Sequence, residues 1–207
     1  MRWIALVLLL GGCAVRDLDR MKDLDARGDW VALAAFHLSE CDSPRDALCA
    51  EAQFLRARGC ARLASGHLSE SDRRRALDCA VEGTRAALAA SGATAPAERT
   101  AWREAYAAAL FARRQALPGQ QACADNAALL HEADRLRAEA PAAPRPRFLA
   151  ASARLTAARL CGAPACPALA EAAPLLRDPP AEAAVQWRAQ WRALAAAIET
   201  TARSLSC

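Results

Sequence analysis

The residues of this sequence best suited to chemistry are its nine cysteines. Cys13 follows an apolar stretch near the start, and the other eight are spread over the rest of the chain, at Cys41, Cys49, Cys60, Cys79, Cys123, Cys161, Cys166 and Cys207. An even number of well-separated cysteines predicts disulfides if the chain folds in an oxidising compartment. A metal cluster is the alternative, but the spacings are wide and no Cys-x-x-Cys occurs. We expect four disulfides, and the sequence leaves their pairing open.

Two of the three histidines lie in a repeated motif, "HLSECD" at 37–42 and "HLSESD" at 67–72. The repeat is either a paired ligand site or a marker of helix junctions. Neither His37 nor His67 has a second histidine three or four residues away, and we expect Cys41, the one candidate partner beside His37, to form a disulfide. We therefore interpret both copies as helix junctions and predict no metal site.

The residues in and around the two copies support this interpretation. In the second copy, Ser69 and Asp72 have the spacing of a capping box, in which the serine hydroxyl accepts a hydrogen bond from an N–H of the first helical turn. In the first copy, the same residues are expected to end a helix that begins near Trp30. The next helix would begin at Asp42 or Ser43, with Pro44 in its first turn.

Motifs for catalysis were sought as well. The third histidine, in "HEADRL" at 131–136, lacks the second histidine of the zinc-hydrolase helix. There is neither a Gly-x-Ser-x-Gly nucleophile turn nor a glycine-rich phosphate loop. The carboxylate pairs at 17/19 and 23/25 lie in a segment of mixed charge, typical of a solvated helix face. The sequence therefore predicts neither an enzyme nor a cofactor.

The first thirteen residues, "MRWIALVLLLGGC", form a targeting segment. The apolar run from Trp3 to Leu10 follows Arg2 and is about half as long as a membrane-spanning helix. The ending Leu10-Gly11-Gly12-Cys13 resembles the bacterial lipobox, in which the cysteine thiol is acylated and the chain is cut before it. An uncleaved anchor or an ordinary secretory signal is the alternative.

The lipobox resemblance implies a domain plan and a location. Residues 1–12 would be a cleaved signal peptide, residues 13–28 the lipidated N-terminus with a first helix or tether, and residues 29–207 the folded domain. More than one acyl chain holds a protein stably at a membrane. Position 14 is alanine, not the aspartate of the pattern that retains lipoproteins at the inner membrane, so in an envelope with two membranes we expect the outer membrane, facing the periplasm.

Composition excludes one class of partner. The formal net charge is +4, and arginines alternate with acidic residues along the chain. Nucleic-acid binding favours a basic stripe with interleaved aromatic residues, and the sequence has no such stripe. We expect no nucleic-acid partner.

The distribution of helix-forming residues along the chain predicts an all-α fold of eight or nine helices. Alternating β-branched runs are absent, and the segments between Gly and Pro residues consist of helix-forming residues. The helices are expected at about 15–26, 29–40, 45–65, 71–90, 97–116, 121–139, 146–160, 166–177 and 181–205. They would stack as antiparallel pairs.

The pairs resemble tetratricopeptide repeats. Gly28-Asp29-Trp30 has the Gly-Asp-aromatic turn of that family, and Gly59 and Gly66 are separated by its seven-residue interval. The resemblance implies a solenoid whose concave surface binds an extended or helical segment, as in pilotins and accessory proteins of assembly machines. An irregular alanine-rich bundle is the alternative.

The last helix carries an apolar stripe at three- and four-residue steps: Trp187, Trp191, Leu194, Ile198, Ala202 and Leu205. Such a stripe usually closes a core, and a partner surface around the two tryptophans is the alternative. Cys207, at the end of the chain, would link this helix to an earlier one.

These observations lead to one hypothesis and two alternatives. We expect a lipid-anchored helical scaffold that binds an envelope protein. The basic residues that could meet carboxylates of the ligand are Arg56, Arg58, Arg62, Arg103, Arg113 and Arg114, unless they form an ordinary charged surface. The alternatives are a small-molecule-binding component of a transport system, which predicts a deep pocket where a scaffold predicts a shallow groove, and a structural envelope protein without a discrete site.

Overall fold

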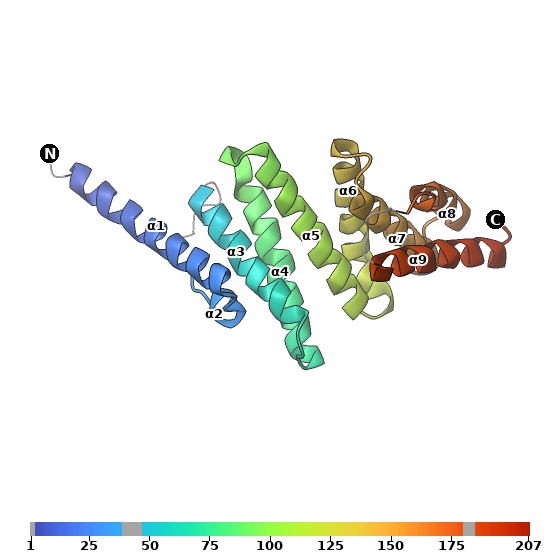
Figure 1. The fold of residues 1–207 in the computed structure, drawn as a ribbon, viewed down its shortest axis with the longest axis horizontal. Helices are drawn as coiled ribbons and strands as arrows, with labels where there is room; N and C mark the ends of the chain where they lie inside the picture. Colours follow the sequence, from blue (N-terminus) through green and yellow to red (C-terminus); the bar gives the residue numbers. More distant parts are fainter. Residues whose placement is uncertain (1–2, 39–46, 180–184) are drawn as a thin grey trace. The chain divides into compact units, whose positions relative to one another are not determined.

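The computed structural model describes residues 3–38, 47–179 and 185–207, and these residues form helices without a strand (Figure 1). The predicted all-α fold is confirmed. The α-helices are α1 (Trp3–Arg27), α2 (Trp30–Ala34), α3 (Ala47–Ala64), α4 (Glu70–Ala90), α5 (Pro96–Ala116), α6 (Ala122–Glu139), α7 (Pro144–Leu160), α8 (Ala165–Ala172) and α9 (Val185–Ser204). Short 3₁₀ helices are η1 (Ser91–Ala93), η2 (Gly119–Gln121) and η3 (Ala173–Leu176).

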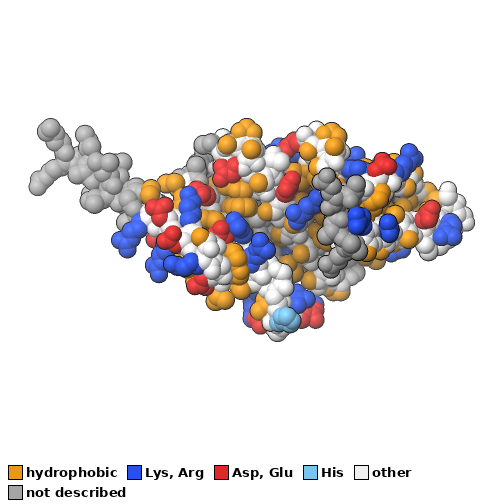
Figure 2. Space-filling view, in the orientation of Figure 1, with side chains coloured by type: hydrophobic (Ala, Val, Ile, Leu, Met, Phe, Trp, Pro, Cys, Tyr) orange, Lys and Arg blue, Asp and Glu red, His pale blue; other side chains and the backbone are white. Residues whose placement is uncertain are grey.

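The chain forms two compact units, residues 1–109 and 110–207, which divide within α5. Each unit has its own core of buried apolar side chains. Figure 2 shows arginine, acidic and apolar side chains interspersed over the visible face. No helix of the described chain is both long and apolar enough to cross a membrane.

In the first unit, α1 and α2 pack on α3. One face of α1 buries Leu18, Met21 and Leu24 in a cluster with Leu33 and other side chains of α2 and α3. The three-residue spacing of these apolar side chains is therefore enough to place one face of the helix in the core. Gly28 ends α1 with a φ of +71°, a conformation that favours glycine. Asp29 then caps α2, since its Oδ1 accepts a hydrogen bond from Ala32 N–H at 3.1 Å.

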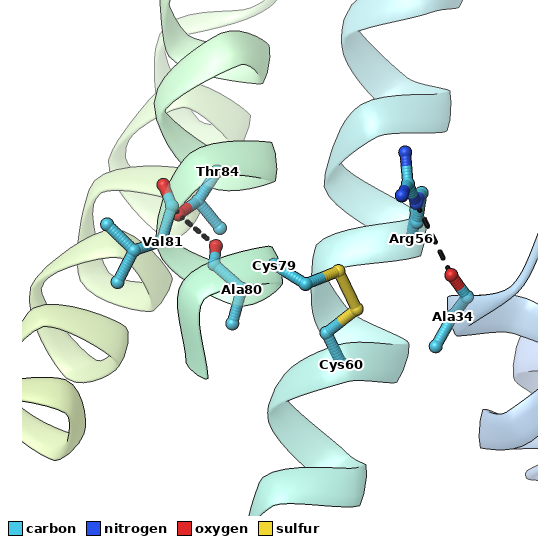
Figure 3. The surroundings of a disulfide bond; sticks show 7 residues. All are labelled: Ala34, Arg56, Cys60, Cys79, Ala80, Val81 and Thr84. Carbon is cyan, nitrogen blue, oxygen red and sulfur yellow. Dashed lines mark hydrogen bonds between the residues drawn. A yellow bond between two sulfur atoms is a disulfide. The ribbon is translucent and has the colours of Figure 1, made fainter. Parts of the chain in front are cut away.

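Close helix packing in this unit depends on small residues. A Cβ at Gly59 would lie 3.0 Å from the backbone nitrogen of Ala34 and 3.1 Å from Leu33 Cγ. A side chain at this position would force α2 to shift slightly, so glycine allows α3 and α2 to pack closely. The helices α3 and α4 form the most extensive pair, and Cys60 of α3 is joined to Cys79 of α4 (Figure 3).

The start of α4 confirms the predicted cap. Ser69 Oγ accepts a hydrogen bond from Asp72 N–H at 3.1 Å and donates one to Asp72 Oδ2 at 2.6 Å. The hydrogen bond from Ser69 and, next, the one from Arg75 lower the pKa of the Asp72 carboxyl. The second copy of the repeated motif is thus a helix junction.

Ser69→Ala tests the cap. We expect it to reduce the free energy of unfolding by about 1 kcal/mol at neutral pH, because an N–H of the first turn loses its acceptor. Because the pKa of Asp72 is lower in the folded state than in the unfolded chain, the ionised carboxyl stabilises the fold above about pH 4. This stabilisation is lost as the pH falls through the lowered pKa. Chemical denaturation at neutral and acid pH should therefore show a smaller difference between the variant and the wild type in acid. A difference that is the same or larger in acid would contradict this assignment.

In the second unit, α7, α8, η3 and α9 pack around Trp191, which is 1% exposed, and α6 packs on α7. The indole Nε1 of Trp191 donates a hydrogen bond to the carbonyl of Leu176 at 2.9 Å, which holds α9 against η3. Ile198 is buried in the same cluster, and Trp187, Leu194 and Ala202 pack against it. The stripe of the last helix therefore closes a core.

Two expectations need correction, and a third is not tested. The segment predicted as a helix over 29–40 forms a helix only from Trp30 to Ala34, so His37 lies beyond the helix and does not close it. Leu205 was assigned to the core stripe but is 48% exposed, because α9 ends at Ser204. The expected caps at Asp42 and Ser43 lie outside the described residues, as does Cys41.

The described disulfides are Cys60–Cys79 between α3 and α4, Cys123–Cys161 between α6 and the end of α7, and Cys166–Cys207 between α8 and the segment after α9. Cys49 is disulfide-bonded too. The predicted link from Cys207 to an earlier helix is confirmed, because Cys166 belongs to α8. A disulfide that closes a longer loop removes more entropy from the unfolded chain, so the bridges of sequence separation 38 and 41 are expected to stabilise the fold most.

Peptide mapping without reduction tests this pairing. We expect linked peptides for the three described bridges. The two cysteines left over after Cys13 is set aside, Cys41 and Cys49, should form a fourth linked pair. A peptide that links Cys79 to Cys123 would contradict the assignment, since that link joins cysteines that are each paired elsewhere.

Candidate functional site

The main hollow of the second unit is a partly open groove between α8 with η3 on one side and α9 on the other. Its volume is about 790 Å³. Two other hollows, beside α3 and α4 and at the end of α9, have volumes of about 320 Å³. The α8 side contributes Leu169, Ala170 and Ala173, and α9 contributes Ala195, Ala196, Ile198 and Ala202. The groove is therefore lined mainly by small apolar side chains.

Two contacts fix the ends of the groove. The Cys166–Cys207 disulfide, with a Cα–Cα distance of 5.3 Å, lies at one end. The hydrogen bond from Trp191 to Leu176 joins the two sides near the other end. Residue 166 thus lies beside 207 and residue 176 beside 191, so α8 and α9 run antiparallel, and the groove follows them lengthwise.

The charged residues of the groove are distributed unevenly. Arg177 and Arg192 directly follow the hydrogen-bonded residues Leu176 and Trp191, and both line the groove. Within the described part of the chain, neither guanidinium has a hydrogen bond or an ion pair. Glu199 lies about two turns along α9 from Arg192, toward the disulfide. One end of the groove is therefore basic, and a carboxylate lies farther along α9 toward the other end.

Other arginines of this unit are engaged between helices. Arg154 of α7 binds Asp134 of α6 through two hydrogen bonds, at 2.9 and 3.1 Å, and Glu171 of α8 at 3.0 Å. Arg147 donates to the carbonyl of Leu175 at 3.0 Å. Arg159 donates to the hydroxyl of Thr201 on α9. These side chains hold the helices around the groove in place.

The arginines expected to meet a ligand have other roles. Arg56 donates to the carbonyl of Ala34 at 3.3 Å, as Figure 3 shows, and Arg58 pairs with Asp25 at 3.0 Å. Arg62 lies over the ring of Trp30, and Arg103 also has a partner. The contacts of Arg56, Arg58 and Arg62 join α3 to α1 or α2, and Arg56 also lines the hollow beside α3 and α4.

Arg113 and Arg114 form a polar network between α5, α6 and α7. Arg113 makes two hydrogen bonds to the carboxylate of Asp125, at 2.7 and 2.5 Å. The buried Arg114 donates to Asn126 Oδ1 at 2.7 Å and to Ser152 Oγ at 2.8 Å, and its guanidinium lies 5.0 Å from the ring centre of Phe111. Burial lowers the pKa of Arg114 to about 10. The network fixes helix positions and lines none of the hollows described above.

The histidines are not brought together as ligands. His37 follows α2, His67 lies between α3 and α4, and both are exposed. Within residues 3–38, 47–179 and 185–207, no group of three His, Cys, Asp or Glu side chains is placed to hold a metal ion. Cys41, the candidate partner of His37 that we expect to form a disulfide, lies outside these residues.

The sequence interpretation missed the groove. A signal was present, since Ala195, Ala196 and Ala202 give α9 a second apolar face beside the tryptophan stripe. The role of the alanine face depends on a neighbouring helix, which the sequence does not specify.

The fold and the groove define a class: an α-helical protein of disulfide-linked helix pairs with one basic-ended apolar groove in its second unit. The chain matches no known protein family, curated protein or solved structure. The function must therefore be inferred from the chain's own residues.

Proposed function

We propose that this protein is a lipid-anchored scaffold of the bacterial cell envelope, which holds a segment of another envelope protein in the groove between α8 and α9. One observation carries the proposal: a partly open groove of about 790 Å³ in which alanine side chains lie over the buried Leu169, Leu176 and Ile198. Apolar surface left exposed in a long groove is typical of a binding site.

The proposed location rests on two further observations. The end of the apolar N-terminal run resembles a lipobox, which makes Cys13 the acylated residue and the outer membrane its site of attachment. The disulfides favour a compartment outside the cytoplasm, because cytosolic proteins rarely keep structural disulfides. Neither observation requires catalysis, a cofactor or a metal.

A small-molecule-binding protein is the second candidate. The volume of the groove lies in the range of ligand pockets, and the Cys166–Cys207 disulfide limits one end. The groove is open along much of its length, however, whereas ligand pockets bury most of the ligand. The openness favours a protein segment.

Site-specific photo-crosslinking separates these candidates. A photoreactive amino acid is placed at Ala196, which is exposed in the groove, or at Ala193, which is exposed on α9 outside it. After irradiation of the cells that make the protein, we expect the Ala196 variant to be joined to one protein and the Ala193 variant to give little of that product. Equal products from both positions, or a product with a lipid or small molecule alone, would contradict the scaffold.

A further inference from the structure

We propose that the occupant of the groove is a short α-helix of the partner protein, with an apolar face and with carboxylates at the end that meets Arg177 and Arg192. The inference rests on the proposed function, because it names the kind of segment that the scaffold holds.

The lining of the groove suits a helix. The interaxial distance of packed helices is about 8–10 Å and depends on the side chains at the contact, with small residues giving the closest approach. Alanines line both sides of the groove, at 170 in α8 and 173 in η3 on one side and at 195, 196 and 202 in α9 on the other. A third helix can therefore pack between them at short range.

The length of the groove sets the length of the segment. Along α9 it extends from Arg192 to the end of the helix at Ser204, about 18 Å at the rise of an α-helix. A helix of about 12–15 residues spans this distance. Such a helix is marginally stable alone, so docking supplies the apolar contacts that stabilise it.

Charge complementarity sets the direction of that segment. Arg177 and Arg192 are available at one end, and a guanidinium binds a carboxylate through two parallel hydrogen bonds. Glu199, farther along α9, repels a carboxylate at its own position. The acidic end of the segment therefore lies beside the two arginines, and a neutral or basic end lies toward the Cys166–Cys207 disulfide.

An acyl chain fits the lining less well. A single hydrocarbon chain gains most from a site that encloses it with large apolar side chains. The large side chains at this groove, Leu169, Leu176 and Ile198, are buried in the core beneath it. The surface above these side chains is open and consists of alanine methyl groups, and it suits the apolar face of a helix.

Charge reversal in the crosslinking protein tests the inference. With the photoreactive residue at Ala196, we compare the unchanged protein with Arg177→Glu/Arg192→Glu and with Arg135→Glu, an exposed arginine of α6 outside the groove. We expect the double reversal to reduce the yield of the protein product at least tenfold and the Arg135 variant to leave it unchanged. The crosslinked peptide, sequenced by mass spectrometry, should have apolar residues at three- and four-residue steps with Asp or Glu toward one end.

The outcomes distinguish the inference from the proposed function. A protein product whose yield survives the double reversal, or a crosslinked peptide without this pattern, would overturn the acidic helix and leave the scaffold standing. A lipid product, or no product, would overturn both. A charge-reversed variant that fails to fold would also lose the product. We therefore include the milder variant Arg177→Gln/Arg192→Gln. We also exchange the partner's carboxylates for arginine, to compensate for the reversed charges. The inference requires that the exchange restore the product of the charge-reversed protein.

Discussion

Trp191→Ala is expected to reduce the free energy of unfolding of the second unit by about 4 kcal/mol, because it removes the largest fully buried side chain and leaves a cavity between α9 and η3. The indole lies 6.0 Å from the ring of Phe148 and 5.7 Å from that of Trp187, so these aromatic contacts are lost too. Chemical denaturation followed by far-ultraviolet circular dichroism measures the change with the disulfides intact.

Two variants refine this result. Trp191→Phe keeps an aromatic ring but leaves the carbonyl of Leu176 without its donor, and we expect a smaller loss of about 1–2 kcal/mol. Leu205→Ala, on the exposed end of the same stripe, should change the stability by less than about 0.5 kcal/mol. A loss for Trp191→Ala no larger than that for Leu205→Ala would show that the stripe does not close the core.

Asn126→Leu is expected to cost about 3 kcal/mol, the second large effect. The substitution removes the acceptor of Arg114 and the donor to the carbonyl of Ala153, and it leaves a buried guanidinium with fewer partners. The same denaturation measurement tests this prediction.

A double-mutant cycle identifies the cause of that loss. When Arg114→Met is added to Asn126→Leu, the buried charge disappears, so we expect the double variant to be more stable than Asn126→Leu alone. Arg85→Ala, which breaks an exposed ion pair with Glu82, provides the control and should change the stability by less than about 0.5 kcal/mol. Simple additivity of the two buried substitutions would contradict the proposed network.

Much of the fold could be predicted because the helix boundaries depend on local chemistry. Gly28 ends α1 and Asp29 caps α2 through contacts with residues nearby in the sequence. Ser69 caps α4 through Asp72, three residues away, at the spacing that the sequence displays. Local signals of this kind are sufficient to place helices without knowledge of the tertiary fold.

The predictions that failed concern contacts made over longer distances. The segment after Trp30 has the composition of a helix, yet α2 ends at Ala34, where Phe36 and Leu38 pack against the cluster of α1 and α3. Arg58 and Arg113 have the appearance of surface arginines in the sequence. Their carboxylate partners lie on other helices and are recognised only once the helices are packed.

The candidate site was hidden for the same reason. Alanine is common throughout the chain, so the alanines of α8 and α9 are not distinctive until two antiparallel helices place them face to face. The existence of the disulfide at the end of the groove could be predicted from the sequence, since Cys207 is expected to link to an earlier helix. The identity of its partner, Cys166, depends on the fold.

The claim on which the rest of the account depends is export and attachment through Cys13, since an envelope partner and the membrane location both follow from it. The most direct test is the intact mass of the protein extracted from membranes of the cells that make it, with a Cys13→Ser variant as control. We predict a chain that begins at Cys13 and carries acyl groups, while the variant is neither acylated nor cut at that position. An unmodified chain that retains residues 1–12, recovered from the cytosol with its other cysteines reduced, would contradict the account.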